Sequence, residues 1–490
     1  MVARPQGRRY ARGLTREPPR SVVALATERG CDAMSFLAGE SGMRHWFDIP
    51  VPEGTGACVA YVDTSGAWVA ACSPLVAAGE AAAYARELPR AALRFVEAAR
   101  ANGKRACFFA SETPQHDGLS RLLIGEQPIF RPGEWLRDLS KRRRLREQLR
   151  RARAKGLRVR GVSPSELTEG SPLRQAVERL ADDWLRSRHI EPMGFLVALE
   201  PFQAPSQHRY FVAERGDRVV GFLSAVPIGQ RRAWLVEDVV RSADAPNGTT
   251  ETLIVALMRE VEGCESVTLG LTPLAGPVAW PLRLARWVAR PLFDFEGLRA
   301  FRERLHPQQW QPVWLLYPSG ASPVLAVVDS LRAFARGSLV GFAARSFARH
   351  PSGLPWVLAL PLPLWTAGLV WLVAVHRASL LGFPRGELAL WAAFDALLLL
   401  VLVRVAMRPQ RSRLLLATSL AGIDAALSLG HLAWVGFGST ALQAWLRTLA
   451  TTAPVLGALL LTWATTRTAA PRSPPGASTV RGTRSLPPAS

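Results

Sequence analysis

Apolar residues occur in runs of two lengths, and the longer runs gather in the C-terminal third of the chain. Four of them lie at about Leu354–Val375, Leu388–Ala406, Leu414–Val435 and Ala441–Trp463. Each is close to the ~20 residues that an α-helix needs to cross ~30 Å of hydrocarbon. Because four such runs follow in series with almost no charge inside them, the pattern favours membrane spans over buried helices of a soluble protein. We predict a four-helix transmembrane region over residues 354–465.

The charges between these runs predict the orientation of the spans. Basic residues gather before the first run, between the second and third, and after the fourth: Arg345, Arg349, His350, Arg404, Arg408, Arg411, Arg413, Arg467 and Arg472. The connection GFGST between the third and fourth runs carries no charge. Since basic loops stay on the cytoplasmic side, we expect a multi-pass protein of the cell inner (cytoplasmic) membrane. Both termini and the preceding domains would lie in the cytoplasm.

Three ionisable residues, Asp395, Asp424 and His431, fall within the predicted spans. Such groups can mark a polar pathway through a membrane. The two aspartates could equally pack against partners inside the helix bundle, and the sequence leaves both interpretations open.

Shorter apolar runs alternate with amphipathic stretches from Ser35 to about Arg160. The segments ACVAYVD, AWVAACS and RACFFAS predict strands, because each is apolar and bounded by polar or turn residues. The stretch AAAYARELPRAALRFVEAARANGK predicts a helix that breaks or kinks near Pro89 and ends at Asn102-Gly103.

A second unit of the same kind runs from about Val162 to Tyr317. Its helix, around Leu173–Arg188, leads to predicted strands with the sequences HRYFVAER, DRVVGFLSAVPI and RAWLVEDVV. Gly216-Asp217 predicts a hairpin turn between the first two. A helix from about Thr249 to Glu262 and a strand at SVTLGL follow. The fold class is therefore α+β, with two units in tandem ahead of the four spans.

These patterns divide the chain into six parts. We expect a basic flexible tail at residues 1–30, a first lobe at 31–160 that ends in a basic helix at 141–155, and a second lobe at 161–318. The pattern of residues 319–353 predicts a basic amphipathic segment next to the membrane, suited to lie on an anionic lipid leaflet. The transmembrane region occupies 354–465, and residues 466–490, rich in Pro, Ser, Arg and Gly, predict a disordered tail.

The charge balance narrows the class of partner. Lys and Arg number 60 against 39 Asp and Glu, which gives a net charge of +21. A field of that sign favours nucleic acid, acidic lipid or a phosphorylated substrate, without choosing among them. The five cysteines are scattered and form no CxxC pair. That argues against a zinc ribbon or a disulfide framework and for a reducing compartment.

The densest charge run, KRRRLREQLRRARAK, covers Lys141 to Lys155. One stripe, made of Leu145, Gln148, Leu149 and Ala152, can dock while the rest of the helix stays cationic. Arginine forks match phosphate oxygens. The candidate phosphate-contact residues are Arg142, Arg143, Arg146, Arg150 and Arg153. A solvated linker helix is the alternative.

Candidate chemistry gathers in the segment WLVEDVVRSADAPNGTTETLI. A predicted strand ends in Glu237-Asp238 and Arg241, and the turn Asn247-Gly248 leads into a helix. The N-terminus of such a helix suits a phosphate or an oxyanion, and the acids, with Glu251, could bind an amino group or transfer protons. An ordinary turn and helix cap is the alternative. No metalloprotease, α/β-hydrolase or nucleotide-fold motif precedes a suitable helix, and no metal site is predicted.

Several segments in order resemble the C-terminal synthase domain of the phosphatidylglycerol lysyltransferase (aminoacyl-phosphatidylglycerol synthase) family. They include GACVAYVDTSGAWVAACSP, LLIGEQPIF, RRRLREQLRRARAKGLRV, YFVAERGDRVVGFLSAVPI, WLVEDVVRSADAPNGTTETLI and FEGLRAFRERLHPQQWQPVWLLYP. The resemblance covers roughly residues 31–318. It implies tandem acetyltransferase-like (GNAT-like) domains, the second of them catalytic, that move an aminoacyl group from aminoacyl-tRNA to phosphatidylglycerol without a cofactor.

The resemblance also implies roles for single residues. Asp238 and Arg241 match the family's Asp-x-x-Arg pattern, and Glu251 stands where an Asp is usual, so these three are the candidate catalytic residues. Glu237, Asn247, Gly248, Arg302 and Arg304 are the candidate substrate-binding residues. Two departures stand out. Cys72-Ser73-Pro74 replaces a Gly-Asp-Pro, and the membrane helices follow the synthase domain instead of preceding it.

The implied activity is transfer of a lysyl or similar group to phosphatidylglycerol by a membrane-anchored enzyme. Three alternatives stay open: another acceptor such as a different lipid or a peptide amine, an acyl-CoA donor, and a non-catalytic membrane-tethered relative. An acyl-CoA donor is disfavoured because only Gly248, after Pro246, stands where two close glycines usually cradle the pyrophosphate.

Overall fold

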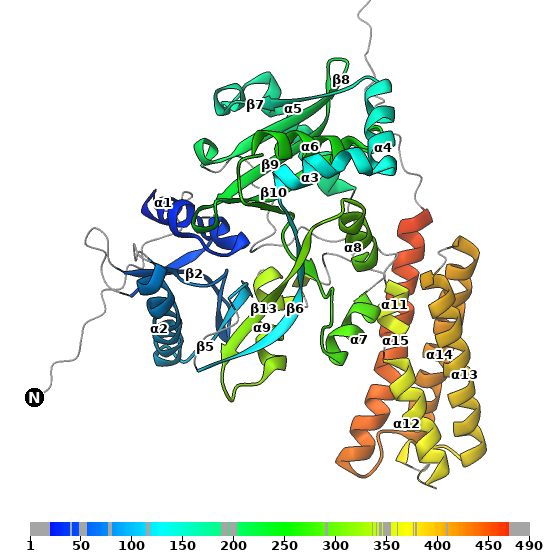
Figure 1. Cartoon of the computed structure of the whole chain (residues 1–490). Coiled ribbons are helices and arrows are strands. Elements are labelled where there is room, and N and C mark those ends of the chain that lie inside the picture. The colour runs from blue at the N-terminus through cyan, green and yellow to red at the C-terminus, as the bar shows by residue number, and fades with distance from the viewer. Residues whose placement is uncertain are drawn as a thin grey trace, which may run out of the picture. The chain divides into compact units, whose positions relative to one another are not determined.

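The computed structural model describes residues 20–469 apart from 40–41, 49–55, 77–80, 114–117, 188–194, 196–201, 203, 290–292, 336, 340, 343–344, 346–353, 360, 376, 378–379 and 408–409. The chain forms two compact units, named here the sheet unit (residues 1–346) and the helical unit (residues 347–490). Figure 1 shows a sheet with covering helices in the first and helices in the second. Residues 1–19 and 470–490 of the two predicted tails lie outside the described residues.

The described residues of the sheet unit form one mixed sheet of thirteen strands, in the order β1-β2-β3-β5-β13-β6-β11-β10-β9-β8-β7, with β4 on β2 and β12 on β6. The strand bounds are Arg44–Phe47 (β1), Ala57–Asp63 (β2), Ala67–Ala70 (β3), Leu75–Val76 (β4), Arg105–Ser111 (β5), Leu119–Phe130 (β6), Leu157–Val162 (β7), Arg209–Arg215 (β8), Arg218–Ile228 (β9), Ala233–Arg241 (β10), Ser266–Thr268 (β11), Thr272–Pro273 (β12) and Gln309–Pro318 (β13). Every strand predicted from an apolar run is present in this sheet.

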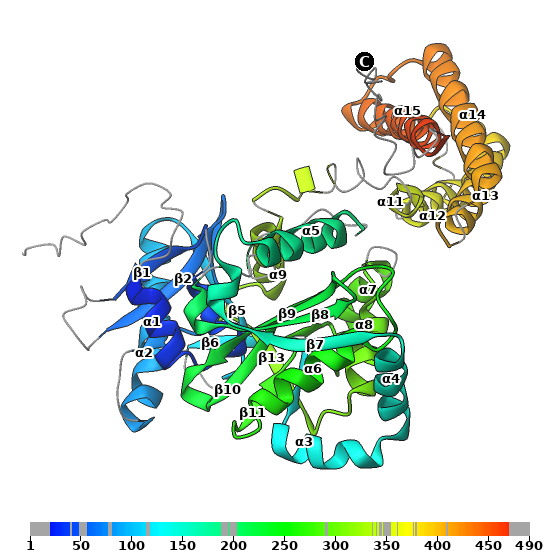
Figure 2. The same ribbon diagram turned by 90° about the horizontal axis from the view of Figure 1, so that it is seen from above.

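The helices of the sheet unit cover both faces of this sheet. Their bounds are Arg20–Arg29 (α1), Ala81–Ala101 (α2), Pro132–Asp138 (α3), Arg143–Ala154 (α4), Pro172–Arg186 (α5), Thr249–Glu260 (α6), Trp280–Ala289 (α7), Phe295–Arg304 (α8) and Pro323–Phe334 (α9). Figure 2 shows α5 and α6 on opposite sides of β8 and β9. The predicted helices around residues 173–188 and 249–262 are α5 and α6.

The two lobes exchange elements across the sheet. Strand β13, from the end of the unit, lies between β5 and β6, and its Val313 and Leu315 belong to the core of the first lobe. In return, Leu145 and Leu149 of α4 are buried in the core of the second lobe together with Phe211 of β8. The basic helix, predicted at the end of the first lobe, thus packs on the second lobe.

Two segments expected to be peripheral are packed against the first lobe. Residues 20–29 of the predicted flexible tail form α1, because its apolar residues Val22 and Ala26 are fully buried in the core. Part of the predicted juxtamembrane segment forms α9, which packs on β3 and β5. Asp329 of α9 accepts two hydrogen bonds from the guanidinium of Arg105, at 2.7 and 2.8 Å.

Within the described residues, the helical unit has four segments that are long and apolar enough to cross a membrane, over Val357–Ala374, Gly386–Met407, Arg411–Val435 and Ala441–Thr466, the first of which runs over α11 and α12. The helix bounds are Leu354–Ala359 (α11), Leu362–Ala374 (α12), Arg385–Met407 (α13), Arg411–Val435 (α14) and Ala441–Ala469 (α15). Leu364, Leu390 and Trp434 are 81, 71 and 91% exposed in this unit. Large apolar side chains on the outside of an apolar bundle fit a lipid environment, so the prediction of four apolar C-terminal helices is confirmed and the protein is a membrane protein.

Candidate active site

A row of polar side chains crosses the three neighbouring strands β8, β9 and β10. The register places Tyr210 opposite Ser224, and Ser224 opposite Asp238. Tyr210 lies in the core beneath α5, together with Phe222 and Val240 of the same sheet face. The row therefore runs along the α5 face of the second lobe.

A β-bulge in β10 brings a second carboxylate into this row. The register with β9 shifts between Val236 and Asp238, so Glu237 is the extra residue. A bulge sets two successive residues against one residue of the partner strand. The hydroxyl of Ser224 consequently lies 3.2 Å from Glu237 Oε2 and 3.3 Å from Asp238 Oδ2. In a regular strand these two acids would point to opposite faces.

His208, the residue before β8, completes the acidic cluster. Its Nε2 lies 2.9 Å from Glu237 Oε2, and its Nδ1 lies 3.1 Å from the carbonyl oxygen of Ala204. The ring stacks on Tyr210 at 5.2 Å and meets the edge of Phe36 at 5.2 Å. The carboxylate of Glu237 on one side and a backbone carbonyl oxygen on the other thus fix the orientation of the imidazole ring.

Burial raises the pKa values of two members of this row, Asp238 and Tyr210. The pKa of Asp238 is raised well above its usual value, first by burial and then by the charge of Glu237, while the Ser224 hydroxyl acts in the opposite direction. The pKa of Tyr210 is also raised, mainly by burial and also by Glu237. A cation that entered beside the two carboxylates would relieve their repulsion. The cluster is therefore suited to bind an ammonium group or to accept a proton.

Arg241 and Glu251 lie on the other face of the sheet. Arg241 is exposed and pairs with Gly221, which points toward Thr249 and Leu253 of α6. Residues three apart in a strand face opposite sides, so Arg241 is separated from Asp238 by the sheet. The structure thus does not bring the three predicted catalytic residues together. Asp238 lies on one face of the sheet, next to Glu237, and Arg241 and Glu251 lie on the other face.

The turn Asn247-Gly248 and Glu251 are linked to the basic helix. Gly248 has a φ of +99°, and a Cβ there would lie 2.9 Å from the carbonyl oxygen of Gln148 in α4. Only glycine meets both demands, since other residues are strained at that φ and would collide with the helix backbone. Glu251 is buried and accepts a 2.7 Å hydrogen bond from Gln148 Nε2. Asn247 is exposed beside this contact.

The two arginines predicted on α8 have different surroundings. Arg302 is buried, and its guanidinium donates to the carbonyl oxygens of Leu269 and Gly270 and to Thr272 Oγ1 at 2.5, 2.8 and 2.6 Å. Burial lowers its pKa to about 9. Arg304, at the end of the helix, is exposed. Arg302 therefore holds the connection between β11 and β12 instead of meeting Arg241.

Helix α4 presents one continuous cationic face. Leu145, Leu149 and Ala152 are buried on its inner side. The exposed arginines repeat at intervals of three and four residues along the outer side: Arg143, Arg146, Arg150 and Arg153. The acid on this helix, Glu147, is bonded by Arg150 and Arg151, which lower its pKa to about 2.

Arg142 differs from the other predicted phosphate contacts. It is half-buried, lies over the ring of Trp135 at 5.2 Å and donates to the carbonyl oxygen of Leu305 at 3.3 Å. Burial lowers its pKa. Arg142 therefore ties the start of α4 to α3 and to the end of α8, and the four exposed arginines above are the ones available to a polyanion.

The segment Cys72-Ser73-Pro74 lies in a separate polar cluster of the first lobe. Asp32 accepts from the backbone N–H of Ser73 at 2.8 Å and of Glu112 at 3.1 Å, and Glu112 pairs with Arg231 from the second lobe. Burial raises the pKa of the Cys72 thiol well above its usual value, so it is an unreactive thiol. This cluster fixes the contact between the lobes.

Sequence reasoning missed His208, Ser224 and Tyr210. The strand patterns contained a signal, because His208 and Tyr210 alternate on one side of HRYFVAER and Ser224 interrupts the apolar run of β9. Their meeting depends on strand register, which the sequence alone did not fix. Among the described residues, no group of three or more His, Cys, Asp or Glu could hold a metal ion.

Comparisons with known proteins agree on one family. A family model described as "Phosphatidylglycerol lysyltransferase, C-terminal" matches residues 23–317. The phosphatidylglycerol lysyltransferase of Bacillus subtilis is 27% identical over 159 residues, which are 30% of this chain and 18% of that protein. The lysylphosphatidylglycerol biosynthesis bifunctional protein LysX of Mycobacterium ulcerans is 29% identical over 272 residues, 52% of this chain and 23% of that one. The chain thus matches about a fifth of the length of each relative.

Two solved structures share the fold of the sheet unit. One is the C-terminal domain of a putative lysylphosphatidylglycerol synthetase from Agrobacterium fabrum, which superposes with a TM-score of 0.54 at 23% sequence identity. The superposition covers 65% of this chain and 97% of that domain. The structure named L-PGS from Bacillus licheniformis gives 0.53 at 20% identity, over 67% of this chain and 100% of its own. The fold predicted from the family resemblance is confirmed.

Proposed function

Since the chain belongs to the phosphatidylglycerol lysyltransferase C-terminal family, we propose that it transfers a lysyl or similar aminoacyl group from aminoacyl-tRNA to phosphatidylglycerol. One observation carries this proposal: a single lobe holds both a partly buried pair of carboxylates, Glu237 and Asp238, and an exposed arginine face on α4. The first suits the ammonium groups of a basic amino acid, and the second suits the phosphates of its tRNA carrier.

The proposed reaction exchanges one ester for another. The glycerol hydroxyl of the lipid attacks the aminoacyl carbonyl carbon, a new carbon–oxygen bond forms, and the bond to the ribose oxygen of the tRNA breaks. The proton of the lipid hydroxyl ends on that ribose oxygen. Because the donor ester is already activated, the protein contributes mainly position and charge stabilisation. No cofactor enters this balance.

The acidic cluster would bind the aminoacyl end of the donor. Asp238 is the candidate for receiving and returning the proton, because burial and the charge of Glu237 raise its pKa and make it a stronger base than an ordinary aspartate. Glu237, oriented by His208, would hold the α-ammonium group. Ser224 bonds to both carboxylates and would keep them in place. His208 and Ser224 are thus positioning residues in this scheme.

The opposite face of the same lobe would hold the tRNA. Arg241, Asn247 and Arg304 are exposed there or at the nearby helix end and would contact phosphates. Glu251 and Gly248 act indirectly, because both pack against Gln148 of α4 and set the position of that helix. Arg302 would support the site through the connection that its hydrogen bonds hold in place.

The location of the donor supports the proposed orientation. Aminoacyl-tRNA is a cytoplasmic molecule, so the sheet unit must lie in the cytoplasm for the reaction to occur. The arginines that flank the apolar helices predict the same side from the positive-inside rule. We therefore propose an inner-membrane protein with both termini in the cytoplasm.

The direct test is reconstitution of the purified full chain with phosphatidylglycerol vesicles and aminoacyl-tRNAs that carry labelled amino acids. We expect a labelled lipid with at least one of them, lysyl-tRNA first, and none when phosphatidylcholine replaces phosphatidylglycerol. A labelled product from acetyl-CoA in the same vesicles would favour the acyl-CoA alternative. Absence of labelled lipid with every aminoacyl-tRNA would falsify the proposal.

Helix α7 carries an apolar stripe suited to present the lipid. Trp280, Leu284 and Trp287 are 67, 51 and 61% exposed and lie four and three residues apart, on one side of the helix. Arg283, beside them, is also exposed. An exposed tryptophan and leucine stripe with an arginine at its edge is suited to a helix that lies in the interface of an anionic membrane.

Replacing Trp280, Leu284 and Trp287 together by alanine is expected to lower transfer to phosphatidylglycerol in vesicles by at least about tenfold, since each large apolar side chain contributes on the order of 1.5–3 kcal/mol when buried. Transfer to a monomeric short-chain phosphatidylglycerol should change much less. The control replaces Phe47, which is exposed at the end of β1, by alanine. An equal loss with both acceptors would contradict the role in lipid presentation.

A further inference from the structure

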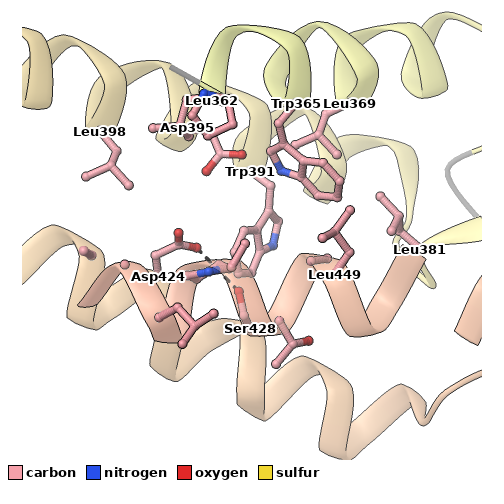
Figure 3. A pocket seen from close by; sticks show the side chains of 18 of the residues that line it. Leu362, Trp365, Leu369, Leu381, Trp391, Asp395, Leu398, Asp424, Ser428 and Leu449 are labelled. Carbon is pink, nitrogen blue, oxygen red and sulfur yellow. Dashed lines mark hydrogen bonds between the residues drawn. The ribbon is translucent and has the colours of Figure 1, made fainter. Parts of the chain in front are cut away.

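A cavity of about 680 Å³ lies inside the helical unit, between α12, α13, α14 and α15. Its wall consists largely of leucine and tryptophan side chains, with a few polar ones: Asp395, Asp424, Ser428, His431, Arg447 and Thr451. Figure 3 shows the carboxyl groups of Asp395 and Asp424 directed into this space from neighbouring helices, with Trp365 and Trp391 beside them. The cavity has no role in the proposed transfer reaction.

The two acids lie at the same depth in the bundle. At 1.5 Å per residue, Asp395 is about 15 Å from the start of α13 at Arg385. On the same scale Asp424 is about 17 Å from the end of α14 at Val435. Consecutive spanning helices run in opposite directions, so these two ends are on one side of the membrane. Both carboxyl groups are therefore near the middle of a hydrocarbon layer of ~30 Å.

Neither carboxyl group has a basic partner among the described residues. Asp395 and Asp424 are each 4% exposed, and no ion pair with any described residue involves them. Asp424 accepts a single long hydrogen bond from Ser428 Oγ, at 3.5 Å. A carboxylate in apolar surroundings is costly unless a cation or a proton accompanies it. The two carboxylates therefore need a positive charge, and no described residue of the protein supplies it.

The basic side chains of the wall have other partners. Arg447 donates to the carbonyl oxygens of Leu380, Val435 and Gly436 at 3.4, 3.2 and 3.0 Å. His431 stacks on Phe383 at 3.6 Å, and its Nε2 lies 3.1 Å from the carbonyl oxygen of Leu381. These contacts hold the connections at one end of the bundle, and neither basic side chain pairs with Asp395 or Asp424, whose polar contacts are the neutral side chains of Trp365 and Ser428.

The shape of the cavity indicates a long ligand. Its lining extends along α13 from Leu388 to Leu402, about 21 Å, and along α15 from Trp445 to Leu461, about 24 Å. The acids lie between apolar stretches on both sides. A proton or a small inorganic cation would satisfy the charge but would leave most of this apolar wall unfilled.

We propose that this cavity binds an amphiphile that carries an ammonium group. The ammonium lies between Asp395 and Asp424, against the faces of Trp365 and Trp391, and the alkyl or acyl chain lies along the leucine wall. Carboxylates and tryptophan rings are the groups that attract such cations. Two sources share this chemistry: a membrane lipid with an aminoacyl headgroup and a cationic amphiphile without phosphate.

The test uses the full-length protein in maltoside micelles. The probe is a long-chain alkyltrimethylammonium whose alkyl group carries bromine, because bromine quenches the fluorescence of nearby tryptophans. The signal of Trp391 is the difference between the wild type and the Trp391→Phe variant. We expect saturable quenching, with an affinity at least about tenfold weaker in the Asp395→Asn/Asp424→Asn double variant. The matched control is Glu387→Gln, which removes an exposed acid of the same helix outside the cavity.

Two further measurements keep the test independent of folding. A brominated alkyl maltoside, with the same chain but no charge, should show no dependence on the two aspartates. Leu398→Phe, which fills part of the cavity, keeps both acids and adds no tryptophan, should also weaken saturable quenching. Quenching that is unchanged in the double variant, or unchanged by Leu398→Phe, would overturn the proposal.

Competition then identifies the source of the ammonium group. Purified lysyl-phosphatidylglycerol is added against the bound alkylammonium, with phosphatidylglycerol as the anionic control. Displacement by the lysyl lipid alone supports a membrane lipid as the ligand, and no displacement supports an amphiphile without phosphate. Displacement by phosphatidylglycerol as well would contradict recognition of an ammonium group. Because the lysyl lipid is supplied ready-made, the outcome does not depend on the proposed transfer activity.

Discussion

Replacing Asp238 by asparagine is expected to lower kcat/KM for aminoacyl transfer by at least about 10²-fold, the usual contribution of a general acid or base. The same change is expected to raise the melting temperature of the sheet unit. Asparagine keeps the shape of the side chain and an oxygen for the Ser224 hydroxyl, but it removes a charge that is buried next to Glu237. A catalytic carboxylate held in this way costs stability.

The gain in stability should depend on pH in a defined direction. Burial and Glu237 raise the pKa of Asp238, so the folded state binds this proton more tightly than the unfolded chain, whose Asp pKa is about 3.9. Stability therefore falls as pH rises from that value toward the folded pKa. The variant should match the wild type in acid and exceed it increasingly at higher pH. A difference of about 1 kcal/mol would correspond to about 2–4 °C.

Thermal unfolding of the full chain across a pH series measures this difference, with Asp244→Asn as the control. Asp244 is exposed in the following loop, and its pKa is lowered by the hydroxyl of Ser242 and by Arg218. Its contribution has the opposite sign, because it is present above the unfolded pKa and lost as pH falls. A lower melting temperature for Asp238→Asn at neutral pH would show that the carboxylate stabilises the fold and would contradict its assignment.

Local sequence patterns were sufficient to predict some of the elements of this protein, although α1 lies in a segment expected to be a flexible tail. The strands β2, β5 and β8 and the helix α6 follow from apolar runs whose ends carry polar or turn residues. The four long helices follow from composition and length alone. Each of these features depends on side chains that are neighbours in the chain, and the physical rule for each is periodicity.

The arrangement of the candidate site depends on contacts that periodicity does not contain. A regular strand would have set Glu237 and Asp238 on opposite faces, and only the bulge in β10 brings both to Ser224. The exchange of β13 into the first lobe is likewise a long-range pairing. Arg302 was predicted from its residue type, but a guanidinium that is bonded to Leu269 and Gly270 serves the backbone.

Neutralising the outer face of α4 is expected to weaken use of aminoacyl-tRNA by a factor on the order of 10²–10³ near physiological salt. The variant replaces Arg143, Arg146, Arg150 and Arg153 by glutamine. Each lost phosphate contact lowers the slope of log affinity against log salt by about 0.7–0.9, so four contacts account for a change of about 3. The buried residues Leu145 and Leu149 are untouched, so the helix should keep its packing.

The matched control removes four exposed arginines that are remote from α4 in the sequence: Arg86, Arg90, Arg100 and Arg121. Both variants carry the same net charge, so a general electrostatic effect would appear in both. The measurement is kcat/KM for aminoacyl-tRNA over a series of salt concentrations. If α4 is a specific tRNA surface, the dependence of log kcat/KM on log salt should become shallower only in the α4 variant. Turnover of that variant should return to the wild-type rate at saturating tRNA. Equal slopes in the two variants would mean that the arginines act through the total field of the protein, and α4 would then be a solvated helix with no particular partner.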